Sequence, residues 1–173
     1  MTDDSLGSEA LRVSKEVCER YARLMPSEEL TLIILKGHLL VEEQMNKFID
    51  ASLSDAGEAF RKCKFPFGGR LEFAKRLLVP KAEFPSADAT FSGVWRGVAE
   101  LNDLRTKIAH NPEVPDLDSL CAAFVKKRSP SEMIDEARDE PTRLKAAIGD
   151  IVVVLAGLRV ARNWQMGKRG SSL

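Results

Sequence analysis

The sequence predicts an all-α protein, because apolar residues recur at helical spacing over several long segments and prolines separate those segments. The chain has 173 residues, of which 44% are hydrophobic and 30% are charged. These values are ordinary for a globular protein, and the length suits one domain with a single core. We therefore expect a single domain over residues 1–173, built as a bundle of four to five core helices with short accessory helices and with flexible ends at about 1–7 and 166–173.

Two helices are expected in the first third of the chain. The first covers about Ser8 to Leu24, where apolar residues recur every three or four positions, and Pro26 ends it. Ser27 has the character of an N-cap, so we expect it to open a second helix that continues to about Leu53. Apolar residues nearly encircle this second helix, which predicts that it lies at the centre of the core.

Three polar residues interrupt the apolar surface of the second helix. The helical wheel places Glu42 and Asn46 on an apolar flank, where both would need polar partners. His38 lies among core residues, and we interpret it as a core histidine with a satisfied hydrogen bond rather than as a ligand or a base.

The middle of the chain alternates short helices with loops. A short segment around 60–64 leads to Gly68-Gly69, which we interpret as a turn before a third helix that ends near Pro80. Residues 81–89 have the composition of a loop.

A further long helix follows that loop. Thr90 or Ser92 can cap it, and its apolar positions continue to Ile108. Asn111-Pro112 ends it, because a residue that precedes proline avoids the helical conformation.

The last third predicts two more helices. Residues 118–127 form a short one, and residues 126–139 are expected to be an exposed excursion. The final helix begins at Pro141 and runs to about Trp164. The run 152–154 consists of valines that alone would suit a strand, but the apolar spacing on both sides is helical.

Charge is balanced over the whole chain but uneven along it. Basic and acidic residues each number 26, so no overall field attracts nucleic acid or anionic lipid. Residues 1–60 hold 12 acidic and 6 basic residues, whereas residues 61–81 hold 1 acidic and 7 basic residues. The basic segment is either a solvated surface that matches the acidic first third or a local contact for RNA or phosphate.

The cysteines and the apolar runs bear on compartment and cofactors. Cys18, Cys63 and Cys121 are far apart and match no metal-binding spacing, so we expect no disulfide, no metal and no other cofactor. The longest apolar run, 151–158, is too short to cross a bilayer, and the first ten residues are polar and acidic. We expect a cytoplasmic protein without a membrane role.

One segment carries a chemical motif. Residues 101–111 read L-N-D-L-R-T-K-I-A-H-N, with Arg105 and His110 five positions apart. This segment resembles the signature helix of the HEPN superfamily, with its R-x-x-x-x-H motif, in the L-N-x-L-R-N-x-x-A-H form of many small bacterial members. Two upstream segments, 37–46 and 71–77, resemble other helices of such members and occur in the same order.

The resemblance implies a helical bundle that commonly dimerises with two signature helices side by side. Active members are metal-independent endoribonucleases. Their histidine acts as general acid or base on the 2′-hydroxyl and the leaving oxygen, and their arginine positions the phosphate. These roles would fall here to His110 and Arg105. Thr106 departs from the pattern, because many active members carry Asn, Asp or His there, and this bears on the activity more than on the fold.

Four further residues are candidates for substrate binding or support. Asn102 lies one turn before Thr106 on the same face, and Asn111 follows His110 directly. Glu42 is the carboxylate that could hold the motif's arginine in place.

The motif pair suits metal-free RNA cleavage. That reaction requires a proton acceptor near the 2′-hydroxyl and fixed positive charge at the phosphate, where negative charge grows in the transition state. Histidine titrates near neutrality and arginine binds phosphate through two donors, so His110 and Arg105 have the required chemistry.

The spacing of the pair raises a geometric problem. On a continuous helix, positions five apart differ by about 140° in azimuth and about 7.5 Å in rise, so the two side chains would not converge. Either the helix unwinds before His110, which Asn111-Pro112 favours, or two subunits combine their residues. The wheel also puts Arg105 in the apolar arc, so the structural alternative is a buried ion pair with Glu42 and a C-terminal capping role for His110.

Three hypotheses about function follow. The first is a dimeric HEPN-like ribonuclease, a toxin or defence effector, that cuts RNA without a cofactor. The second is a noncatalytic HEPN-like binding or regulatory module, similar to mannitol-operon-repressor-like proteins. The third is a structural interaction domain without nucleic acid contact. The partners expected are a second copy of the chain, RNA, and an antitoxin or regulatory protein.

Overall fold

The computed structural model confirms the all-α fold. It describes residues 3–53, 56–78, 85–111, 113–128 and 139–170, and all regular structure in these residues is helical. The described helices are α1 (Asp3–Leu24), α2 (Leu30–Leu53), α3 (Ala56–Lys62), α4 (Phe67–Leu77), α5 (Pro85–His110), α6 (Leu117–Arg128) and α7 (Glu140–Gly170). Within this part of the chain no helix is both long enough and apolar enough to cross a membrane.

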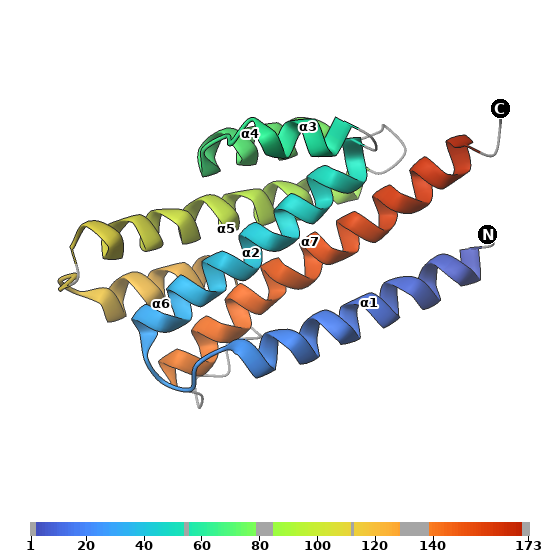
Figure 1. Ribbon diagram of the computed structural model, residues 1–173. Helices are drawn as coiled ribbons and strands as arrows, with labels where there is room; N and C mark the ends of the chain where they lie inside the picture. The colour runs from blue at the N-terminus through green and yellow to red at the C-terminus, as the bar shows by residue number, and fades with distance from the viewer. Residues whose placement is uncertain (1–2, 54–55, 79–84, 112, 129–138, 171–173) are drawn as a thin grey trace.

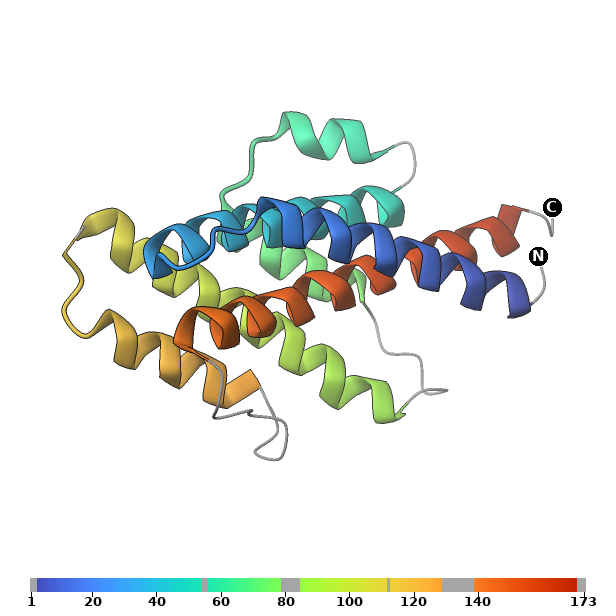
Figure 2. The ribbon, with the colours of Figure 1, turned by 90° about the horizontal axis from the view of Figure 1, so that it is seen from below.

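Helices α2 and α7 run side by side through the centre of the bundle and form its most extensive interface (Figure 1). Helix α1 packs against α7 on one side, α5 and α6 lie on the other, and the short α3 and α4 contact α2 (Figure 2). The prediction that the second helix is central is confirmed, because its largest apolar side chains are fully buried: Ile33, Ile34, Val41, Met45 and Phe48.

A glycine allows the two central helices to approach closely. A Cβ atom on Gly37 would lie 2.9 Å from Cγ2 and 3.0 Å from Cδ1 of Ile148 in α7. Both distances are shorter than carbon atoms normally adopt, so a side chain at residue 37 would have to displace Ile148.

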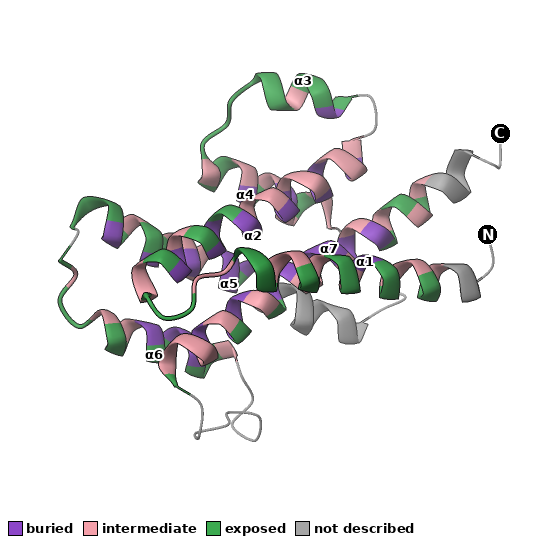
Figure 3. Cartoon of the chain, turned by 60° about the horizontal axis from the view of Figure 1, so that its bottom comes forward, coloured by how far each residue is buried: buried purple, intermediate pink, exposed green. Residues whose placement is uncertain are grey.

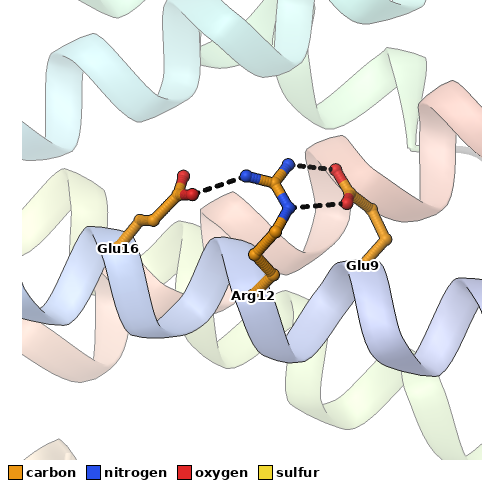
Figure 4. Close-up of polar contacts among 3 residues, drawn as sticks. All are labelled: Glu9, Arg12 and Glu16. Carbon is orange, nitrogen blue, oxygen red and sulfur yellow. Dashed lines mark hydrogen bonds and ion pairs between the residues drawn. The ribbon is translucent and has the colours of Figure 1, made fainter.

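Helix α1 packs on the bundle with one face and exposes the other (Figure 3). Its buried face is anchored by Val13, which forms a small cluster with Ala156 and Val160 of α7. On the exposed face, Arg12 lies between two carboxylates (Figure 4): it donates to Glu9 at 2.7 and 2.9 Å and to Glu16 at 2.5 Å. Exposed pairs of this kind contribute little to stability, so the apolar face holds α1 in place.

The start of α2 differs from the expectation. Helix α2 begins at Leu30, where the Ile33 N–H donates to the Glu29 carbonyl at 2.9 Å, so the prediction of Ser27 as N-cap was wrong. The Ser27 carbonyl instead accepts a hydrogen bond from Nζ of Lys145 in α7 at 2.9 Å. A contact between distant segments therefore shapes this connection.

The start of α4 also differs. Gly68 and Gly69 lie in the first turn of α4, so the prediction of a turn at these glycines was wrong. Pro66 occupies the N-cap with extended backbone (φ −61°, ψ 158°), and a proline pre-organised in this way suffices to start the helix.

Helix α5 begins earlier than expected. It starts at Pro85, upstream of Thr90 and Ser92, so neither residue caps it. The predicted loop over 81–89 therefore overlaps α5 from residue 85 onward, and residues 81–84 lie outside the described residues. Proline is well suited to the first turn of a helix. It has no backbone N–H, but an N–H at this position would have no partner within the helix. The predicted end at Asn111-Pro112 is confirmed.

The last two helices are confirmed. Helix α6 covers the predicted short helix, and α7 includes the valine run 152–154, because Ile151 and Leu155 on either side are buried at helical spacing. Residues 126–128 belong to α6 rather than to the expected excursion, and residues 129–138 lie outside the described residues.

Both terminal helices extend further than expected. Helix α1 starts at Asp3 and α7 continues to Gly170, although we expected flexible ends over 1–7 and 166–173. Leu6 and Ala10 pack against the cluster around Val13, and this contact holds the first turns of α1 against the bundle. Residues 1–2 and 171–173 lie outside the described residues.

Candidate functional site

Arg105 lies on the exposed surface of α5. Its neighbours Leu101, Leu104 and Ile108 are buried and carry the packing of this helix. No hydrogen bond or ion pair joins Arg105 to another residue that the structure describes. The expectation that Arg105 lies inside the apolar arc was therefore wrong, because the helix is rotated so that this edge of the arc meets solvent.

His110 is the last residue of α5 and is also exposed. The helix is continuous up to it, since the Asn111 N–H donates to the Lys107 carbonyl at 2.9 Å. The expected unwinding before His110 does not occur, because a proline at 112 constrains only the residue directly before it. Within one chain the imidazole and the Arg105 guanidinium therefore start from positions about 140° apart around the helix.

His38 is buried in α2 and contacts residues from two other helices. Its side chain is 6% exposed. Asn102 Oδ1 of α5 lies 3.2 Å from His38 Nε2 and can only accept, so the ring donates from this nitrogen. The ring also packs against Phe67 of α4, with 4.6 Å between centroids. The interpretation of His38 as a core histidine with a satisfied hydrogen bond is confirmed.

Burial lowers the pKa of His38 below its ordinary value of 6.5. The Glu42 carboxylate, whose Oε2 lies 3.8 Å from His38 Nδ1, and the Asn102 hydrogen bond act in the opposite direction. The positive charges of Arg105 and Arg70 also lower the pKa. His38 is therefore neutral at physiological pH and acts as a hydrogen-bond donor.

Glu42 and Asn46 have a common partner in α4. Arg70 donates from Nη2 to Glu42 Oε1 and, at 3.1 Å, from Nη1 to Asn46 Oδ1. Glu42 and Asn46 are the two polar residues that the helical wheel placed on an apolar flank. The prediction that they need polar partners is confirmed, and Arg70 is that partner. The expected pair between Glu42 and Arg105 was wrong, since Arg70 takes the carboxylate.

His38, Glu42, Asn46, Arg70 and Asn102 form one group, which we call the α2–α4–α5 polar cluster. Sequence reasoning identified all of these residues except Arg70. Arg70 was counted only as one cation of the basic segment, and its distance of 28 positions from Glu42 in the chain contains no local signal of the contact.

The remaining candidates have local roles or no described polar contact. Asn111 Oδ1 accepts a hydrogen bond from the Glu113 N–H at 3.2 Å, which stabilises the turn after α5. Thr106 is partly buried, whereas its neighbours in the sequence, Arg105 and Lys107, are exposed. Among the residues that the structure describes, no group of three or more His, Cys, Asp or Glu side chains is arranged to hold a metal ion.

Comparison with known proteins found no family model, no curated protein and no solved structure that matches this chain.

Proposed function

We propose that the exposed end of α5 binds RNA and cleaves it without a metal, as a HEPN-like endoribonuclease in which two chains combine their residues. Arg105 holds the phosphate of the scissile bond. His110 of the partner chain accepts the proton of the 2′-hydroxyl as this oxygen attacks phosphorus, and then gives that proton to the departing 5′-oxygen as the phosphorus–oxygen bond breaks. The products would be a 2′,3′-cyclic phosphate and a 5′-hydroxyl end.

The observation that carries the proposal is that Arg105 is exposed and has no ion-pair partner among the described residues. Two other arginines that contact the bundle are paired: Arg70 binds Glu42, and Arg128 binds Glu100. A guanidinium that is left unpaired on a helix surface is available for a phosphate, which it binds through two parallel donors. His110 is exposed on the same end of the same helix.

The need for a second chain follows from the continuous helix. Because α5 is unbroken up to His110, the two side chains diverge within one chain. A two-fold axis beside α5 would bring Arg105 of one chain toward His110 of the other.

The test is RNA cleavage by the purified chain in the presence of EDTA. We expect single-stranded RNA to be cut, with cyclic phosphate ends, and we expect Arg105→Ala and His110→Ala each to lower the rate by about 100-fold or more. Lys107→Ala is the matched control, because Lys107 is an exposed cation between the two. Absence of cleavage, or cleavage that is unchanged in His110→Ala, would refute the enzyme proposal.

A second candidate is a noncatalytic binding or regulatory module with the same HEPN-like bundle. The divergence of the two side chains along α5 favours it, because binding through Arg105 does not require His110. This function predicts a stable complex with a regulatory protein that is weakened by Arg105→Ala and unaffected by His110→Ala. Copurification of the tagged chain and its two variants from the native host separates it from the first proposal.

A further inference from the structure

Three phenylalanine rings form a column beside the bundle. The Phe73 and Phe60 centroids lie 4.5 Å apart with 22° between the ring planes, and the Phe60 and Phe65 centroids lie 4.9 Å apart with 28°. Phe73 and Phe60 are partly buried against the core, whereas Phe65 at the outer end is 44% exposed. The column therefore ends in a ring with accessible surface.

The exposed ring belongs to the connection between α3 and α4. Figure 3 shows α3 and this connection projecting from the bundle with mostly exposed residues. Phe65 and Phe60 line a cavity of about 240 Å³, together with Arg61, Lys64 and Arg70. The remaining lining residues are Asn46, Ile49 and Asp50. The same cavity is therefore lined by aromatic rings and by positively charged side chains.

The charges of this hollow leave a net positive excess. Asp50 is paired with Arg61 at 2.5 Å, and Arg70 is paired with Glu42. Lys64 is exposed and has no ion pair with a described residue. A further negative group would therefore find donors here.

The backbone at Lys64 is unusual. Its φ of 49° lies in the left-handed region, which a side chain with a Cβ occupies at a cost of about 1 kcal/mol. Glycine would be the unstrained residue at such a helix end. A lysine at this position is consistent with a use for its charge.

We propose that Phe65 and the cations around it form a binding site for single-stranded RNA, in which one base stacks on the Phe65 ring and the adjoining phosphate contacts Lys64. An exposed aromatic ring beside cations is the arrangement that binds unpaired bases, and duplex RNA does not offer a free base face. The site rests on the proposed function, since it supplies a substrate contact for the same enzyme.

The site is linked to α5 through adjacent contacts. Phe67 follows Phe65 by two residues and packs on the His38 ring, and His38 in turn bonds Asn102 of α5. The cavity itself is lined by residues of α2, α3, α4 and the connection between α3 and α4, so RNA bound at Phe65 would contact this part of the molecule first.

The test measures binding rather than cleavage. The probe is a short, fluorescently labelled single-stranded RNA, and its anisotropy is followed with the full chain carrying His110→Ala, so that the probe stays intact. We expect Phe65→Leu to weaken binding about tenfold, because leucine keeps the apolar bulk but removes the ring, and Phe65→Trp to retain it. Leu11→Ala, at a 74% exposed apolar residue on α1, is the matched control and should leave the affinity unchanged.

A second variant tests the charge. Lys64→Gly keeps the left-handed backbone and removes the cation, so it should fold as well as the parent while lowering the slope of log affinity against log salt by about one. Circular dichroism melts of each variant confirm that the fold is intact.

The outcomes separate this inference from the proposed function. Equal affinity of Phe65→Leu and the parent, or equal affinity for duplex and single-stranded RNA, overturns the stacking site even when the wild-type chain cleaves RNA. Weaker binding by Phe65→Leu without any cleavage by the wild-type chain supports the site and refutes the enzyme. No binding of the probe by the parent overturns the site.

Discussion

At the scale of single residues, the two histidines occupy opposite environments. His38 is buried in α2 and bonded to Asn102, whereas His110 is exposed at the end of α5. Only the exposed ring can reach a large substrate without rearrangement of the core. This contrast is why the proposed proton transfer is assigned to His110 and not to His38.

The lowered pKa of His38 has a consequence for stability. The unfolded chain binds a proton at this residue near pH 6.5, whereas the folded chain binds it only at lower pH. Between these values the unfolded state carries more protons at His38. The contribution of His38 to the free energy of unfolding is therefore constant above pH 6.5 and decreases as the pH falls through 6.5 toward the folded pKa.

Urea unfolding at about pH 8 and about pH 5 measures this effect. We expect His38→Gln to reduce the loss of stability at the lower pH, since its amide can still donate to Asn102 but does not titrate. Leu39→Gln, at an exposed residue of the same helix, is the control and should leave the loss as it is in the wild type. An unchanged loss in His38→Gln would contradict the assignment.

At the scale of elements, one ion pair joins α4 to the centre of the bundle. The side chains of Glu42 and Arg70 are 24% and 22% exposed, so both are largely removed from solvent. Removing one partner from such a pair leaves the other charge without compensation. Helix α4 has few other polar contacts with α2, which makes this pair its specific attachment.

We expect Glu42→Gln to lower the free energy of unfolding by about 1 kcal/mol, because the pair is partly exposed and glutamine retains a neutral acceptor. Glu16→Gln on α1 is the matched control: its carboxylate also binds an arginine, but on a fully exposed surface (Figure 4), and no measurable change is expected. Equal effects of the two substitutions in urea titrations would argue against a structural role for the Glu42 pair.

The crossing of α2 and α7 supplies a second prediction at this scale. Gly37→Ala should destabilise the protein by about 1 kcal/mol, because the gain in helix propensity is outweighed by displacement of the buried Ile148. Gly157→Ala in α7 should instead stabilise it by about 0.5–1 kcal/mol, since a Cβ atom there meets nothing within 4 Å. Thermal melts of both variants measure the direction of each change in stability. If both variants were stabilised, or both destabilised, the close approach at Gly37 would not explain the effect of Gly37→Ala.

At the scale of the whole molecule, the proposed reaction requires two chains. Arg105 and His110 start from positions about 140° apart on one unbroken helix, so the two side chains of one chain do not converge on a common site. If Arg105 of one chain works with His110 of its partner, a chain that lacks one residue can be complemented by a chain that lacks the other.

Mixing Arg105→Ala with His110→Ala tests this arrangement. After subunit exchange, half of the dimers combine the two variants and each of these has one intact site, so we expect about a quarter of the wild-type cleavage rate. Each variant alone should remain inactive, and light scattering should give the mass of a dimer for all three samples. No recovery on mixing, with exchange confirmed, would refute a site shared between chains.

Much of the architecture was predictable because its causes are local. Apolar spacing and proline positions located the helices, and the encircling apolar residues of 30–53 identified the central helix. The ends of helices were less predictable where distant groups compete for them, as at Ser27, whose carbonyl accepts from Lys145. A capping preference within four residues contains no information about a lysine over one hundred positions away.

The sequence by itself determined the all-α class, the order of the helices, the candidate pair on α5 and the need of Glu42 and Asn46 for partners. Only the tertiary structure decided that Arg70 is that partner, that Arg105 is left exposed and unpaired among the described residues, and that three phenylalanines stack toward solvent. The physical reason is that helical periodicity depends on neighbours along the chain. The rotation of each helix, and hence the choice of partner, depends on how all buried surfaces pack together.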